Sequence, residues 1–158
     1  MPLALFLVVN IDANRAKGND LYIRSLPTKM NQQFTAQDLY LIETLVRFWD
    51  FRREEDQWCL AELDAITESN PFKTWRLILA LVKAAPSRRV LLQIGAGPLE
   101  RLLSKNGPAF IGSIKDEVKS NVKLLYALSG AGIIGSESKE IQRLWDKYNL
   151  WHADQLIF

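Results

Sequence analysis

Few side chains in this sequence could act as a nucleophile or a metal ligand. The chain has one cysteine, Cys59, and one histidine, His152. A thiol nucleophile needs a basic partner, and nothing in the sequence brings these two residues together. Cys59 lies at helical spacing from Leu63 and Ile66, which predicts a buried thiol. One cysteine and one histidine are also too few for the usual zinc sites. We therefore expect no catalytic residue, no metal and no cofactor.

Asp64 and Glu68 are the carboxylates whose spacing could serve acid–base or metal chemistry, because residues four apart share one face of a helix. Metal sites in helical proteins add a Glu-x-x-His pattern or a neighbouring histidine, and this chain has neither nearby. A solvated charged face is the preferred interpretation of this pair.

The glycine turn Gly95-Ala96-Gly97-Pro98 is the remaining candidate for ligand binding. With the apolar run Val90–Ile94 before it and a helix after it, the turn resembles the nucleotide-binding entry of methyltransferases that use S-adenosylmethionine. In that arrangement, glycines let the backbone approach the ligand at a helix amino-terminus. However, Glu100 occupies the third glycine position of G-x-G-x-x-G, and few residues follow to complete a doubly wound sheet. A methyltransferase-like ligand binder at this turn is kept as an alternative function.

A structural role explains more of these residues. Ser87 is placed to cap a helix that stops at Gly95, and Gly97 is placed to cap the next. Pro98 then takes the first helical position, with Glu100 in the first turn against the positive helix end. Gly107 ends that helix and Pro108 opens another. The predicted structural turn thus comprises Gly95, Gly97, Pro98, Glu100 and Gly107.

Similar start signals recur along the chain. Thr35 with Asp38 forms a variant of the capping box, and Asn70-Pro71 provides a cap and a first helical position. Apolar residues at helical spacing follow each signal. These patterns predict an all-α fold of six or seven helices packed as hairpins, loosely like a solenoid.

Length and composition indicate one domain. The chain has 158 residues, of which 48% are hydrophobic and 24% charged, which is ordinary globular composition. Residues 31–158 are expected to form a single helical domain, and residues 1–30 an arm with a possible short strand over residues 3–9. The apolar run in that arm is too short for a membrane span. A single cysteine fits a reducing compartment, so we expect a cytoplasmic protein.

Charge is unevenly distributed along the chain. Residues 35–70 carry three Lys/Arg and nine Asp/Glu, whereas residues 71–123 carry ten Lys/Arg and three Asp/Glu. The two segments could face one another inside the fold or present charged surfaces to a partner. In the second case, the expected partner-binding residues are an acidic cluster and a basic ridge: Glu54, Glu55, Asp56, Lys115, Lys119 and Lys123.

A resemblance to a known family is carried by Trp58, by Pro71 and Trp75 with Leu77-Ile78-Leu79, and by Ala96-Gly97-Pro98-Leu99-Glu100 with Leu102-Leu103 and Gly107. Over roughly residues 40–145 the chain resembles a family of small bacterial helical proteins of unknown function with an A-G-P-L-E-x-L-L-x-x-x-G signature. It departs from the family pattern at Arg101, where an acidic residue is usual, and at Gly130-Ala131-Gly132, where Gly-Val-Trp is usual. The resemblance implies a helical fold and no established activity.

The sequence as a whole favours a non-catalytic protein-binding module of the immunity-protein or antitoxin kind. Its expected partner is another protein, with no membrane involved. Nucleic-acid binding is a further alternative, but the aromatic residues fall at core spacing and are not interleaved with the basic ones.

Overall fold

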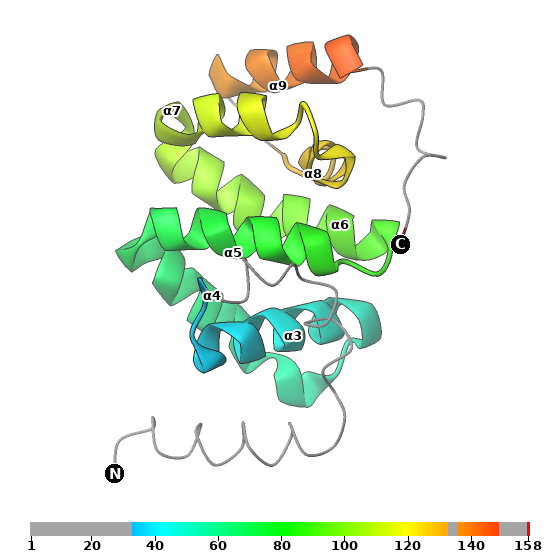
Figure 1. The fold of residues 1–158 in the computed structure, drawn as a ribbon. Coiled ribbons are helices and arrows are strands. Elements are labelled where there is room, and N and C mark those ends of the chain that lie inside the picture. The colour runs from blue at the N-terminus through cyan, green and yellow to red at the C-terminus, as the bar shows by residue number, and fades with distance from the viewer. Residues whose placement is uncertain (1–32, 133–135, 149–157) are drawn as a thin grey trace.

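The computed structural model describes residues 33–132 and 136–148, together with Phe158. These residues form an all-α fold, as predicted, and no strand occurs among them. Figure 1 shows the helices stacked in layers, from α3 and α4 at one end to α9 at the other. The predictions about the arm at residues 1–30 and its strand lie outside the described residues.

Helix α3 spans Ala36–Phe51. Its start is the predicted capping box: the Thr35 hydroxyl accepts a hydrogen bond from the Asp38 backbone N–H (3.1 Å), and the Asp38 carboxylate accepts one from the Thr35 N–H (3.0 Å). The helix ends at Arg52, which adopts a left-handed backbone conformation.

The short helical turn η2 (Glu54–Asp56) leads into α4 (Trp58–Ser69). A buried ion pair ties this turn to α3, because the Arg47 guanidinium donates two hydrogen bonds, each 2.7 Å, to the Asp56 carboxylate. The hydrogen bonds to Asp56 raise the pKa of Arg47 above its ordinary value, against the opposing effect of burial.

Helix α5 (Pro71–Ala84) occupies the middle of the fold and packs against α3, α4, α6, α7 and α8. Asn70 caps it by accepting from the Lys73 N–H (3.0 Å), and Pro71 takes the first position, as predicted. Its buried face contributes fully buried aliphatic side chains to one continuous core: Leu77, Ile78, Leu81 and Val82.

Helix α6 (Arg88–Ile94) begins at Ser87 as expected, but it does not stop at Gly95. The chain continues through η3 (Gly95–Leu99), one turn of π-helix, directly into α7 (Glu100–Glu117). The expected joint with caps at Gly95 and Gly97 is therefore wrong. The Glu100 N–H donates to the Gly95 carbonyl five residues back, and this wider turn accommodates Pro98, which lacks an N–H and would crowd an ordinary α-helix.

The expected break near Gly107 is present one residue earlier, because Asn106 has non-helical backbone angles and kinks α7 there. Beyond α7, helix α8 spans Val122–Leu128 and α9 spans Ser136–Tyr148, packed against α7 and α8. No helix within the described residues is long and apolar enough to cross a bilayer.

Two glycines allow α8 to approach η3 and α6 at backbone distance. A Cβ atom added to Gly95 would lie 1.8 Å from the Ala127 carbonyl oxygen, and one added to Gly130 would lie 2.5 Å from the Leu92 carbonyl oxygen. Only glycine fits such contacts. The π-helical turn is thus fixed against the end of α8.

Candidate functional site

An open groove of about 570 Å³ runs between the end of α3, the first half of α4, and η3 with the start of α7. Aromatic and aliphatic side chains of α3 and α4 form its floor, and charged side chains stand along its edges. Its lining consists of Phe48, Trp49, Arg52, Leu60, Leu63, Asp64, Gln93, Ala96, Gly97, Pro98, Glu100, Arg101, Ser104 and Lys105.

The π-helical turn forms one wall of this groove. Ala96 and Gly97 are exposed there, whereas Pro98 turns inward and is buried. A Cβ atom added to Gly97 would meet no atom within 4 Å. The wall therefore presents nearly bare backbone to the groove, and π-helical turns of this kind are frequent at functional sites.

Arg52 stands at the opposite edge, at the end of α3. It is the only non-glycine residue among those described with a positive φ (φ 56°, ψ 41°). Its N–H donates to the Phe48 carbonyl (2.8 Å), and its guanidinium lies 5.9 Å from the Phe48 ring centroid. Glycine usually occupies this position after a helix, because a side chain costs about 1 kcal/mol there.

Ion pairs close the rim between α4 and α7. Arg101 lies 2.7 Å from an Asp64 carboxylate oxygen and 3.4 Å from Glu68, and Lys105 also pairs with Glu68. The hydrogen bond from Lys105 is the first cause that lowers the pKa of Glu68. Of the carboxylates predicted to form a solvated face, Glu68 is exposed and Asp64 half-buried, and each has a basic partner on α7.

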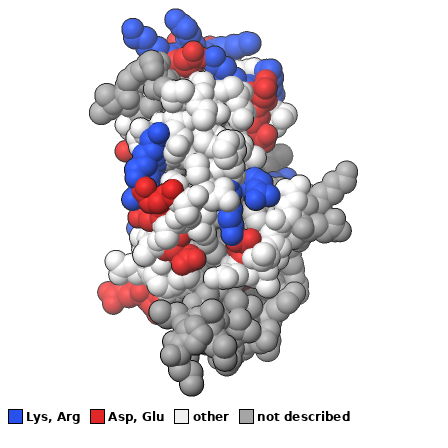
Figure 2. Space-filling model, turned by 90° about the vertical axis from the view of Figure 1, so that its left-hand side faces the viewer, with Lys and Arg blue, Asp and Glu red and all other residues white. Residues whose placement is uncertain are grey.

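These rim pairs belong to a wider pattern in which the acidic segment faces the basic one. Lys73 lies 2.6 Å from Asp38, and Arg89 lies 3.3 Å from Asp50. Figure 2 shows blue and red side chains next to one another in the middle of the face it presents, with blue predominating at its upper end. The acidic and basic segments therefore face one another at these pairs, the first of the two arrangements that the charge distribution allowed.

The predicted acidic cluster is divided by the fold. Glu54 and Glu55 are exposed on η2, but Asp56 is 4% exposed and bound to Arg47. The expectation that Asp56 lies on a partner-binding surface is wrong, because its carboxylate is committed to the buried ion pair.

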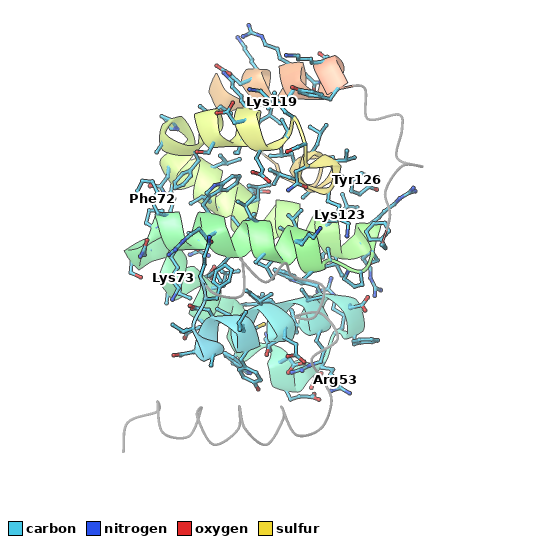
Figure 3. The ribbon with its side chains drawn as sticks, in the orientation of Figure 1. Arg53, Phe72, Lys73, Lys119, Lys123 and Tyr126 are labelled. Atoms are coloured by element: carbon cyan, nitrogen blue, oxygen red, sulfur yellow. The ribbon has the colours of Figure 1, made fainter. Side chains whose placement is uncertain are left out.

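The predicted basic ridge is also divided. Helix α7 ends at Glu117, so Lys115 lies on α7, Lys119 in the turn that follows it, and Lys123 on α8. Figure 3 shows Lys119 and Lys123 in separate parts of the structure. A single ridge of three lysines is therefore wrong.

Each of these lysines has a partner within the protein. Lys115 pairs with Glu140 of α9, and Lys119 lies 2.7 Å from Asp116. The Lys123 ammonium donates to the Ala85 carbonyl (3.1 Å), and burial lowers its pKa.

Among the residues assigned to the structural turn, Gly95 packs against Ala127, and Glu100 and Gly107 have surroundings that differ from the predicted helix ends. The Glu100 carboxylate accepts a hydrogen bond from the Gly132 N–H (2.7 Å) and so ties α7 to the segment after α8. Gly107 is buried directly after the kink.

Two of the chemical roles considered from the sequence lose their structural basis. Cys59 is fully buried, and burial raises the pKa of its thiol to about 12, which disfavours the reactive thiolate. Val90–Ile94 is helical, so the strand that a nucleotide-binding turn requires is not formed there. Within the described part of the chain, no group of three or more His, Cys, Asp or Glu side chains could hold a metal ion.

The sequence profile of a family of unknown function, DUF6869, matches residues 50–147, more than half of the chain. The chain belongs to the DUF6869 family. The predicted resemblance to a family without a known function is thereby confirmed. No curated protein and no solved structure matches the chain.

The DUF6869 match includes η3 and nearly all of the groove lining, since only Phe48 and Trp49 precede it. Sequence reasoning missed Arg52 and the apolar floor as parts of a site. A signal for Arg52 was available, because α3 ends without the glycine that commonly follows a helix. No sequence signal placed Phe48 and Leu60 in one groove with Gly97.

Proposed function

We propose that this protein is a non-catalytic protein-binding module of the immunity-protein or antitoxin kind, and that it binds its partner through the groove beside η3. It acts in the cytoplasm of a bacterium, a setting that suits its single, buried cysteine.

The groove is the observation that carries this proposal. Its floor offers apolar surface from Phe48 and Leu60, while Ala96 and Gly97 let a partner approach the backbone of the opposite wall. A groove with an apolar floor and a charged rim is a common site for a segment of another protein.

The contact surface is assigned to the groove and not to the charged clusters, because most side chains of those clusters already pair with other residues of the protein. Asp56, Lys115, Lys119 and Lys123 all have partners within the fold. Their charges contribute to long-range steering of a partner, but their removal would also disturb internal contacts.

Co-expression tests the proposal. The product of the gene adjacent to this one is expressed alone and together with the protein, and growth and co-purification are measured. We expect the neighbouring product to be toxic and the protein to neutralise it by forming a complex. A neighbouring product that is neither toxic nor bound contradicts the proposal.

A pair of glycine variants assigns the effect to the groove. Gly97→Leu projects a side chain into it, whereas Gly112→Leu adds the same side chain at an exposed position of α7 outside the lining, where a Cβ also meets no atom within 4 Å. Neutralisation should be lost only in Gly97→Leu. Equal neutralisation by both variants contradicts the assignment.

A further inference from the structure

We infer that the groove takes a partner segment whose apolar side chains lie on its floor and whose carboxylate pairs with Arg52. This inference rests on the proposed function and adds the chemistry of the bound segment.

The form of the groove favours a segment of chain over a small molecule. Pockets for small ligands usually enclose most of the ligand surface, whereas this groove is open to solvent and lined by residues of α3, α4, α6, η3 and α7. A peptide segment can use such a groove because its flanking residues add contacts outside it.

Arg52 is the cation of the lining that remains available for a carboxylate. Arg101 and Lys105 already pair with Asp64 and Glu68. Arg52 has no carboxylate partner among the described residues, and its contact there is with the Phe48 ring at 5.9 Å. A guanidinium binds a carboxylate through two parallel hydrogen bonds, so an incoming Asp or Glu side chain satisfies a group that the fold leaves exposed.

The backbone at Arg52 supports the same assignment. A residue held in the left-handed region at a cost in stability is an indication of function when its surroundings explain the placement. Here the unfavourable conformation directs the chain away from α3 at the groove edge, with Arg52 in the lining and the neighbouring Arg53 outside it.

A peptide selection tests the inference. Random peptides displayed on phage are selected on the full chain and on Gly97→Leu, with Gly112→Leu as the matched control. We expect the peptides enriched on the wild-type protein and on Gly112→Leu to combine aromatic or aliphatic residues with Asp or Glu, and to bind Gly97→Leu weakly.

Charge reversal then tests Arg52 itself. The affinity of an enriched peptide is measured against Arg52→Glu and against Arg53→Glu, which reverses the neighbouring exposed residue outside the groove. Arg52→Glu should weaken binding roughly 10- to 100-fold, and Arg53→Glu should change it little.

The outcomes separate this inference from the proposed function. Peptides that lose affinity for Gly97→Leu, but lack acidic residues and bind Arg52→Glu normally, overturn the inference and leave the groove as a binding site. A selection that yields no peptide sensitive to Gly97→Leu overturns both.

Discussion

The contact between Gly95 and the end of α8 predicts opposite effects for two substitutions in the same turn. Gly95→Ala places its Cβ atom 1.8 Å from the Ala127 carbonyl oxygen, 2.9 Å from the carbonyl carbon and 3.2 Å from the Ala131 nitrogen. Gly97→Ala, two residues further on, places its Cβ atom in open space. Both glycines lie in η3 with helical neighbours on each side.

The expected magnitudes follow from these distances. Inserting a methyl group into a packed contact costs about 1–3 kcal/mol of stability. The cost at Gly95 should lie at the upper end of this range, because the opposing atoms are backbone atoms, which cannot move aside as a side chain can. The Ala127 carbonyl also accepts a hydrogen bond from the Gly130 N–H (2.9 Å), which a shift of this carbonyl would weaken. The gain in helix propensity is at most about 1 kcal/mol. Gly95→Ala should therefore destabilise by about 2 kcal/mol, whereas Gly97→Ala should stabilise by up to ~1 kcal/mol.

Chemical denaturation followed by circular dichroism measures both free energies of unfolding, and thermal unfolding provides a second readout. For a domain of this size, 2 kcal/mol corresponds to a lowering of Tm by roughly 4–8 °C. Gly112→Ala serves as a further control, since its Cβ atom would also meet open space in a helix.

Equal stability of Gly95→Ala and Gly97→Ala would refute the reasoning. That result would mean that α8 does not approach the π-helical turn at backbone distance, and the wall of the groove would then need a different support.

Three further predictions concern buried polar groups. Asp56→Ala removes the partner of a buried guanidinium, so the free energy of unfolding should fall by about 3 kcal/mol; a loss below 1 kcal/mol in a denaturant titration would contradict the buried pair with Arg47. Burial raises the pKa of Asp38, but hydrogen bonds from Lys73 and Thr35 outweigh it and hold this pKa below its ordinary value of 3.8. The free energy of unfolding of the wild-type protein should therefore exceed that of Asp38→Asn by about 1 kcal/mol at pH 7. This difference should persist above pH 3.8 and disappear as the pH falls through the lowered pKa. Unfolding curves at several pH values would show it. Cys59 should resist iodoacetamide at pH 8 in the native protein and react after unfolding; rapid native alkylation, detected by mass spectrometry, would contradict its burial.

The helix starts could be predicted because their signals are local. Thr35 with Asp38, and Asn70 with Lys73, interact across three residues, so sequence spacing contains the whole interaction. The all-α class followed from these starts and from the apolar periodicity between them.

The π-helical turn could not be predicted in the same way. Gly95 reads as a helix stop because glycine commonly ends helices, but here it serves close packing against Ala127, which lies far along the chain. The sequence alone does not distinguish a glycine required by close packing against a distant backbone from one required by a local turn.

The surface positions of the predicted partner-binding residues were only partly foreseen, since Asp56 is buried and Lys123 lies on a different helix from Lys115. Charge counts showed that the two segments carry opposite net charge, but they did not show whether each segment would pair with the other or with a partner. The structure provides the partners internally, as Asp64 with Arg101 and Asp38 with Lys73 show. The groove itself is formed where α3, α4, α6, η3 and α7 come together, and the apolar periodicity of each helix does not show which helices will be neighbours.

The pairing of acidic with basic segments has a consequence for how the chain is made. Synthesis proceeds from the amino-terminus, so the acidic helices α3 and α4 leave the ribosome before the basic residues of α5 to α7 that neutralise them. During that interval residues 35–70, with nine Asp/Glu and three Lys/Arg, lack both their basic partners and the central helix that completes the core. Emergence of residues 71–105 then supplies the hydrophobic centre and the counter-charges together, which couples collapse of the first half to arrival of the second.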